Sequence, residues 1–165
     1  MPGFNAGEIA RVHAFLTGRK DVSTIELVVA EDHTDTAVLH AILATASTPA
    51  STPAKLAIVG GQASLAAAAK ARLYSPNNYY SWIFGLLTVY DKPDAVAAAL
   101  SLPKNIAVLL LSPLDEMLKP LGAAAASAEY AFASKVGGAR LTVHAEPLPT
   151  SPDALAAVGK WFAGN

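Results

Sequence analysis

The chain of 165 residues contains no cysteine, and only 15% of its residues are charged. Without cysteine there can be neither a disulfide framework nor thiolate chemistry, which fits a reducing compartment. The formal net charge is −1, so the chain lacks the basic surface that binds a phosphate backbone. We therefore expect no nucleic-acid partner.

Long apolar runs are also missing. Strictly apolar stretches such as 106–111 are far shorter than the roughly 20 residues that a membrane-spanning helix needs. The first residues show no basic segment followed by an apolar run, which is the pattern of a secretory signal. These two observations predict a cytoplasmic protein with no membrane partner.

Hydrophobic residues make up 53% of the chain, enough to form a core. Apolar, β-rich runs alternate with helical patterns, an arrangement that predicts a parallel sheet covered on both faces. The expected strands are 24–30, 55–59, 82–89, 106–111 and 140–144. The expected helices between and after them are 34–46, 62–73, 93–100, 114–136, with a break near 120–122, and 152–162. The fold class is thus α/β, a three-layer, doubly wound, five-stranded parallel sheet of flavodoxin-like form.

An additional amphipathic helix is expected near residues 6–17, ahead of the first strand. We divide the chain into a lead-in helix or linker at 1–20 and an α/β domain at 21–165. In open parallel sheets, ligands bind beyond the carboxyl ends of the strands. The polar groups expected there are Glu31-Asp32-His33-Thr34-Asp35, Gly60-Gly61-Gln62, Tyr90-Asp91-Lys92-Pro93, Ser112-Pro113 and His144-Ala145-Glu146-Pro147.

The order of these strand ends resembles the receiver domain of bacterial response regulators, over about residues 25–162. Glu31 and Asp32 match the acidic pair of that family, and Ser112 matches its switch hydroxyl. Gly61 resembles the glycine before the second helix, and Pro147 the proline of the Lys-Pro loop. The resemblance implies a receiver-like domain at 21–165.

The departures from the family pattern concern its phosphorylation chemistry. Val89 falls at the position of the phosphoacceptor aspartate, Asp91 follows two residues later, and Glu146 replaces the lysine. A carboxylate about 4 Å from a phosphoryl group costs roughly 1 kcal/mol in water and about 4 kcal/mol near a protein surface. Without a third carboxylate, Glu31 and Asp32 would hold magnesium only weakly. We expect no tight metal site and no cofactor.

The resemblance therefore implies a pseudo-receiver, a phosphorylation-independent interaction or regulatory module of two-component signalling. Its partner would be a histidine kinase or another signalling protein, and a homodimer through the last helices is a further option. Two alternatives stay open. In one, Asp91 is phosphorylated with the help of Glu31, Asp32 and Ser112; in the other, the sheet binds a small ligand or carries an enzymatic site.

Weaker interpretations attach to single motifs. Thr34 or Asp35 is expected to cap a helix, which is favoured over a Toprim-like site because no later Asp-x-Asp exists. Gly60-Gly61 lacks a nucleotide-binding fingerprint and is interpreted as a site of tight packing.

The remaining motifs give weak indications of a site. His33 and His144 could share a metal or act as a base, and either could activate Ser112 with Asp32 or Asp35 as its partner. A packing role is favoured for the aromatic cluster Tyr79, Tyr80, Trp82 and Phe84.

Overall fold

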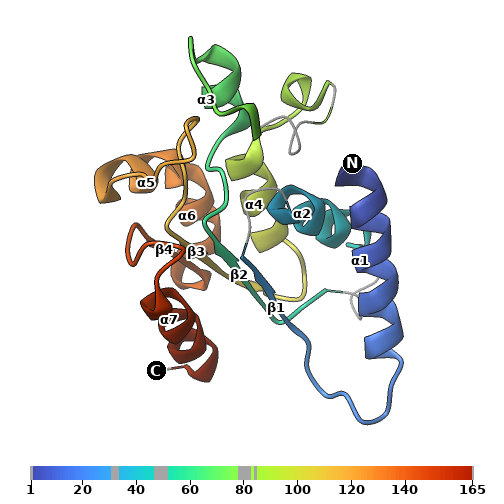
Figure 1. Cartoon of the computed structure of the whole chain (residues 1–165). Helices are drawn as coiled ribbons and strands as arrows, with labels where there is room; N and C mark the ends of the chain where they lie inside the picture. Colours follow the sequence, from blue (N-terminus) through green and yellow to red (C-terminus); the bar gives the residue numbers. More distant parts are fainter. Residues whose placement is uncertain (1, 31–33, 47–51, 78–82, 84, 165) are drawn as a thin grey trace.

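The computed structural model describes residues 2–30, 34–46, 52–77, 83 and 85–164. It contains a parallel sheet flanked by helices (Figure 1). The strands are β1 (Glu26–Val29), β2 (Lys55–Val59), β3 (Ala107–Leu111) and β4 (Leu141–His144). The helices are α1 (Pro2–Thr17), α2 (Thr34–Ala44), α3 (Leu65–Lys70), α4 (Lys92–Leu100), α5 (Ala123–Glu129), α6 (Ala131–Gly137) and α7 (Pro152–Ala163), with short 3-10 turns η3 (Leu86–Thr88) and η4 (Gly138–Arg140).

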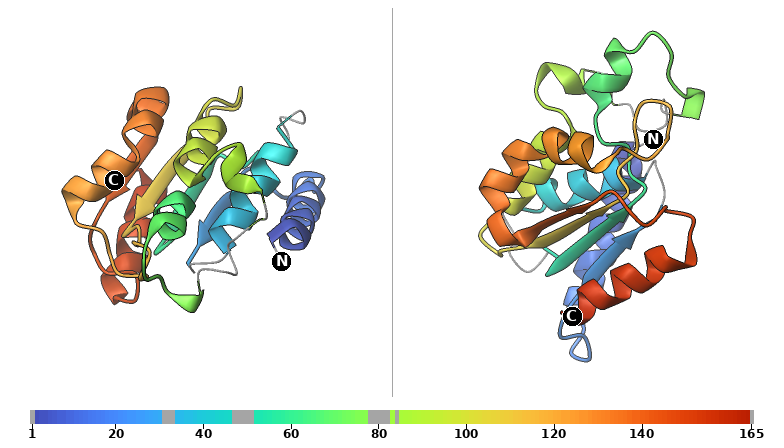
Figure 2. Two further views of the ribbon diagram at one scale, coloured as in Figure 1. Left: turned by 90° about the horizontal axis from the view of Figure 1, so that it is seen from above. Right: turned by 90° about the vertical axis from the view of Figure 1, so that its left-hand side faces the viewer.

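The strands follow one another across the sheet in the order β1-β2-β3-β4, and every neighbouring pair is parallel. Because right-handed crossovers between successive neighbours all pass over one face, α2, α4 and α6 lie together. Helix α7 lies on the opposite face, as the two views of Figure 2 show. The predicted three-layer α/β architecture is confirmed.

The prediction of five strands and a doubly wound order is not met by the described residues, which form four strands without a reversal. The segment expected to be a strand at 82–89 accounts for this difference. Trp82 and Phe84 lie outside the described residues, and Gly85 is the N-cap of the 3-10 turn η3. Gly85 has φ +77°, which interrupts an extended backbone. Val89, at the end of this segment, is 79% exposed and unlike a residue of a central strand.

The predicted helices differ from the structure by one or two residues at their ends, except for three that differ more. Helix α3 begins at Leu65 rather than 62, because the Ser64 hydroxyl accepts from the Ala67 amide and caps it. The long helix predicted at 114–136 is two short helices, α5 and α6, and neither includes 114–122. Helix α1 begins at Pro2, ahead of its predicted start.

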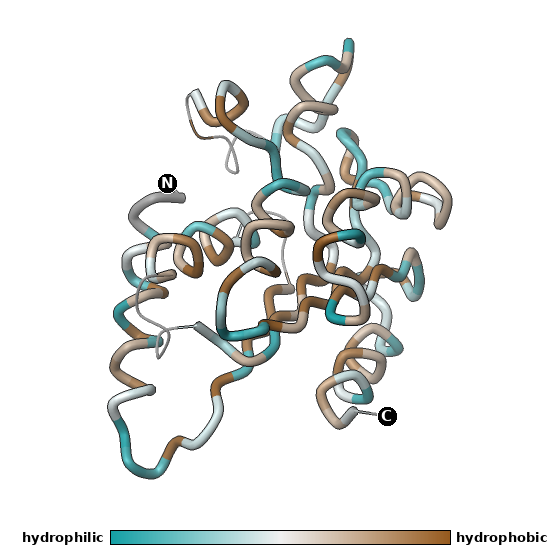
Figure 3. Tube along the Cα trace, turned by 180° about the vertical axis from the view of Figure 1, so that it is seen from behind, coloured by the Kyte–Doolittle hydropathy of each residue, from teal (hydrophilic) through white to brown (hydrophobic). Residues whose placement is uncertain are grey.

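Alternation along the strands divides the core into two clusters. Leu56 and Ile58 face α2, α4 and α6, whereas Ala57 and Val59 face α7. Alanines on α4 let it lie close to its neighbours, and Figure 3 shows the hydrophobic strands in the middle of the molecule. The sheet is therefore the buried layer that fixes the positions of its carboxyl ends.

Helix α7 is attached to the sheet by Lys55 at the start of β2. Its ammonium donates to the carbonyl oxygen of Phe162 (2.6 Å) and lies 5.4 Å from the centroid of the Trp161 ring. A cation is favourable at a helix C-terminus and over an aromatic face. Among the described residues, no helix has the length and hydrophobicity to cross a membrane.

Candidate functional site

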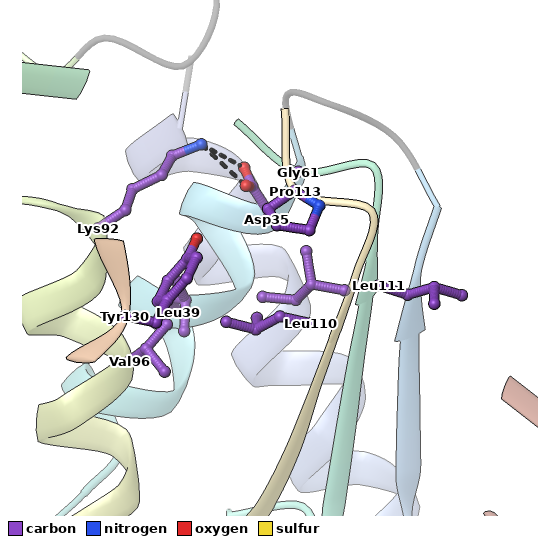
Figure 4. A pocket seen from close by; sticks show the side chains of 10 residues that line it. Asp35, Leu39, Gly61, Lys92, Val96, Leu110, Leu111, Pro113 and Tyr130 are labelled. Carbon is purple, nitrogen blue, oxygen red and sulfur yellow. Dashed lines mark hydrogen bonds and ion pairs between the residues drawn. The ribbon is translucent and has the colours of Figure 1, made fainter. Parts of the chain in front are cut away.

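A buried ion pair lies at the carboxyl end of the sheet, between the first turns of α2 and α4. The Lys92 ammonium is 2.8 Å from Oδ2 and 3.0 Å from Oδ1 of Asp35, and each side chain is 3% exposed (Figure 4). Asp35 Oδ1 also accepts from the Thr36 amide (2.6 Å). A carboxylate buried in this way needs such partners to stay ionised.

Gly61 lets the chain after β2 pass directly beside this pair. A Cβ atom at Gly61 would lie 2.6 Å from Asp35 Oδ2 and 2.7 Å from Ile58 Cγ2. The tight-packing interpretation of Gly60-Gly61 is therefore supported, since Gly60 has φ +70° and its Cβ would lie 2.8 Å from Pro149.

Tyr130, from the start of α6, closes the inner side of the pair. Its hydroxyl donates to the carbonyl oxygen of Ala63 (3.3 Å), and burial, followed by the negative charge of Asp35, raises its pKa. A cavity of about 10 Å³ between Tyr130, Asp35 and Lys92 has room for about one water molecule. Beside the ion pair, the described residues thus leave too little space for a substrate.

Asp91 is the N-cap of α4 and also binds the N-terminus of α3. Its Oδ1 accepts from the amides of Leu65 (2.8 Å) and Lys92 (2.7 Å), and its Oδ2 accepts from Ser64 Oγ (2.5 Å) and the Ala66 amide (3.2 Å). Both oxygens are therefore engaged with two helix N-termini, where a negative charge is stabilised. Asp91 joins α3 to α4.

Ser112 follows β3 and is fully buried, with φ +51°. Its hydroxyl donates to the carbonyl oxygen of Pro147, and its amide donates to that of His144 (2.7 Å). Of the predicted pocket residues, Ser112 and Pro147 are thus brought together, while Glu146 is exposed beside them. The hydroxyl is held by the backbone that follows β4.

The other predicted site residues are not all described. Glu31 and Asp32 lie outside the described residues, as do His33, Tyr79, Tyr80, Trp82 and Phe84. Val89 is on an exposed turn rather than at a strand end, which corrects its assignment to a phosphoacceptor position. Among the described residues, no group of three His, Asp or Glu side chains could hold a metal ion.

Sequence reasoning missed the role of Lys92 and Tyr130, and it considered Asp35 as a helix cap or as the partner of a histidine base, not as the partner of a lysine. Lys92 lies one residue before the predicted start of the helix at 93, and the structure places it in the first turn of α4, where the helix dipole disfavours a cation. Nothing in the spacing of the sequence identifies Asp35 as its anionic partner.

A second polar pair connects α2 to the segment before α4. His40 Nδ1 lies 2.6 Å from the Thr36 carbonyl oxygen, and its Nε2 is hydrogen-bonded to the Tyr90 hydroxyl. Because a carbonyl only accepts, Nδ1 carries the proton, and in the neutral ring Nε2 accepts from Tyr90. Both ring nitrogens are therefore hydrogen-bonded: Nδ1 fixes the ring to α2, and Nε2 holds the Tyr90 hydroxyl.

Comparison of the chain with models of protein families, with curated proteins and with solved structures found no match.

Proposed function

We propose that the chain is a pseudo-receiver, a non-catalytic module that binds a signalling protein through its surface and does so without phosphorylation. The observation that carries this proposal is the Lys92–Asp35 pair, in which one basic and one acidic group at the carboxyl end of the sheet neutralise each other. Removing one partner of a buried pair costs about 3–5 kcal/mol. A phosphoryl group would have to compete with Asp35 for the Lys92 ammonium.

The strand order of the described residues is compatible with a flavodoxin-like sheet that lacks one strand. Flavodoxin-like sheets have the order 2-1-3-4-5, and without their second strand the order becomes sequential, as it is here. On that basis β2 takes the place of the family's third strand, and the residue at the phosphoacceptor position is Gly60 or its neighbour rather than Val89. Ser112 and Pro147 keep the family positions that the sequence resemblance gave them.

The alternative of phosphorylation at Asp91 is disfavoured by the bonds that its carboxylate makes. Both oxygens accept hydrogen bonds, two of them from the start of α3. An acyl phosphate on either oxygen would remove the carboxylate charge and displace at least one helix N-terminus. The small-ligand alternative has no observation at the ion pair that favours it, because the cavity there is about 10 Å³.

The proposal is tested by incubating the protein with acetyl phosphate and magnesium and measuring its intact mass. We expect no added phosphoryl group, and no amide shifts on titration with beryllofluoride and magnesium. Labelling that is lost in Asp91→Asn but kept in the surface variant Asp153→Asn would contradict the proposal and establish Asp91 as a phosphoacceptor.

The positive part of the proposal concerns the surface beside Ser112. Glu146 and Leu155 are exposed on the segment after β4 and on α7, the region that would contact a partner. We expect a cognate histidine kinase to be retained by the immobilised protein and released by Glu146→Lys with Leu155→Arg. The matched change Lys135→Glu, on α6 at the other face, should leave retention unchanged.

A further inference from the structure

A hollow of about 540 Å³ lies between α1 and strand β1, at the edge of the sheet. Figure 1 shows α1 standing beside α2 at that edge, far from β4 and α7. Its lining is mainly aliphatic and comes from both elements, including Ile9, Val12, Leu16, Ile25, Leu27 and Val28. Small-molecule sites commonly have volumes of about 300–1,000 Å³ and apolar walls.

The hollow exists because α1 packs against α2 rather than on the sheet. Strand β1 is an edge strand, so one side of it has no neighbouring strand within the described sheet. Val12 is 57% exposed and Val28 is 49% exposed. Covering such aliphatic surface is favourable, because apolar area is removed from water.

A positive charge lies in a neighbouring hollow. A second hollow of about 220 Å³ shares His13 and Ile25 with the first, and Lys104 lines it. The Lys104 ammonium donates to the carbonyl oxygen of Thr52. An ammonium has three N–H donors, so this bond occupies one of them.

The charged side chains around the two hollows are an acidic residue that is already paired and a lysine near their shared wall. Glu8, which lines the larger hollow, is paired with Arg11 at 2.9 Å. His13 lies where the two hollows meet, and burial, followed by the charge of Lys104, lowers its pKa. The imidazole is therefore neutral near pH 7, and Lys104 supplies the positive charge at this junction.

We propose that these adjoining hollows, which share His13 and Ile25, together bind an aliphatic carboxylate of the fatty-acid type. The alkyl chain would lie along the aliphatic wall between Val12 and Val28, and the carboxylate would reach the ammonium of Lys104. An apolar trough with a cation in the adjoining hollow matches this class of ligand in both shape and charge. The site is separate from the surface on which the proposed pseudo-receiver role depends.

The test uses sodium decanoate below its micelle concentration, added to protein with isotopically labelled Ile, Leu and Val methyl groups. We expect saturable shifts of the methyl resonances of Ile9, Val12, Ile25 and Leu27, with no shifts for Val158, which α7 buries against the opposite face of the sheet. 1-Decanol, which has the same chain without the charge, should bind more weakly. Absence of saturable shifts in these methyl groups would overturn the proposal.

Two variants separate the charge from the apolar wall. Lys104→Met should weaken decanoate binding about fivefold, as expected for loss of a surface ion pair, and should leave decanol binding unchanged. The matched change Lys160→Met, on α7, should have no effect on either ligand. Equal binding of decanol and decanoate, unaltered by Lys104→Met, would overturn the assignment of a carboxylate.

Val12→Trp places a large side chain into the hollow from an exposed helix position and should abolish binding. Phe132→Trp, at an exposed position of α6, is its control and should not. If the same methyl resonances shift with protein concentration in the absence of ligand, and sedimentation gives a doubled mass, a second copy of the chain covers the hollow and the proposal is wrong.

Discussion

Lys92 and Asp35, which are 57 residues apart in the sequence, share a buried ion pair in which one ammonium contacts both carboxylate oxygens. The pair joins the first turn of α2 to the first turn of α4. It stands where the parallel strands end and where other folds of this class bind their ligands. Its consequences for stability can be measured directly.

Lys92→Met is expected to lower the free energy of unfolding by about 3–5 kcal/mol, because it leaves the Asp35 carboxylate buried without its cation. The double variant Asp35→Leu with Lys92→Met should be less destabilised than either single variant, since no unpaired charge remains. Equilibrium unfolding in urea measures all three. Additive losses in the double variant would show that the two side chains do not interact.

Asp91→Ala should lower the free energy of unfolding by about 1–2 kcal/mol, because Asp91 caps α4 and also accepts from two amides of α3. Hydrogen exchange of the α3 amides should become faster, and this readout distinguishes loss of the α3 contact from loss of the α4 cap alone. Asp153→Ala, in the exposed first turn of α7, should change the stability by no more than about 0.5 kcal/mol.

Gly61→Ala is expected to destabilise the protein by about 1–3 kcal/mol, because its Cβ would overlap Asp35 Oδ2 and Ile58 Cγ2. Gly159→Ala provides the opposite case: it lies within α7 and a Cβ there meets no atom within 4 Å. That change should raise the stability by about 0.5–1 kcal/mol through helix propensity. Thermal unfolding of the two variants should move in opposite directions.

Lys55→Met should loosen α7 at an expected cost of about 1 kcal/mol, because Lys55 bonds the Phe162 carbonyl and lies over the Trp161 ring. The amides of α7 should exchange faster, while those of α2 on the opposite face keep their rates. Lys160→Met, an exposed lysine of α7 itself, is the control for loss of a charge. Equal effects of the two variants would contradict a specific role for Lys55.

The parts of the fold that the sequence predicted well are those with a uniform pattern. The run 55–59 coincides with β2, and the ends of β3 and β4 fall at the predicted residues 111 and 144. β2 and β3 are apolar except for Lys55 and are buried along most of their length, and turn residues follow them, which is the pattern of a buried parallel strand. β4, with the sequence Leu-Thr-Val-His, is only partly buried. Helix α7 was also anticipated, because Pro152 and its spaced apolar residues mark its start and its inner face.

The segment before α4 shows why an apolar run alone does not define a strand. Leu86, Leu87 and Val89 suit a strand by composition, but Gly85 turns the chain, and Leu86 is the buried member of this group. A short apolar run has the same sequence pattern whether it forms a strand or a turn that buries one of its residues. The missing information is tertiary, since it depends on whether a neighbouring strand is available.

The candidate site was predicted only where backbone position determines it. Ser112 and Pro147 meet because β3 and β4 are adjacent and parallel, so their ends lie at one edge. The pairing of Asp35 with Lys92 depends instead on how α2 and α4 pack against each other. That packing involves residues far apart in the chain, and a single sequence carries no signal for it.

His13 gives the chain a predicted dependence of stability on pH. Burial, followed by the charge of Lys104, lowers the pKa of its imidazole in the folded protein below the ordinary value of 6.5. As the pH falls below 6.5, the unfolded chain takes up a proton that the folded chain does not, so the free energy of unfolding decreases until the pH reaches the folded pKa. His13→Leu removes this contribution. Urea unfolding at pH 7.5 and pH 5.5 should therefore show a smaller loss of stability on acidification in the variant than in the parent protein, and an equal loss in both would exclude His13 as the source.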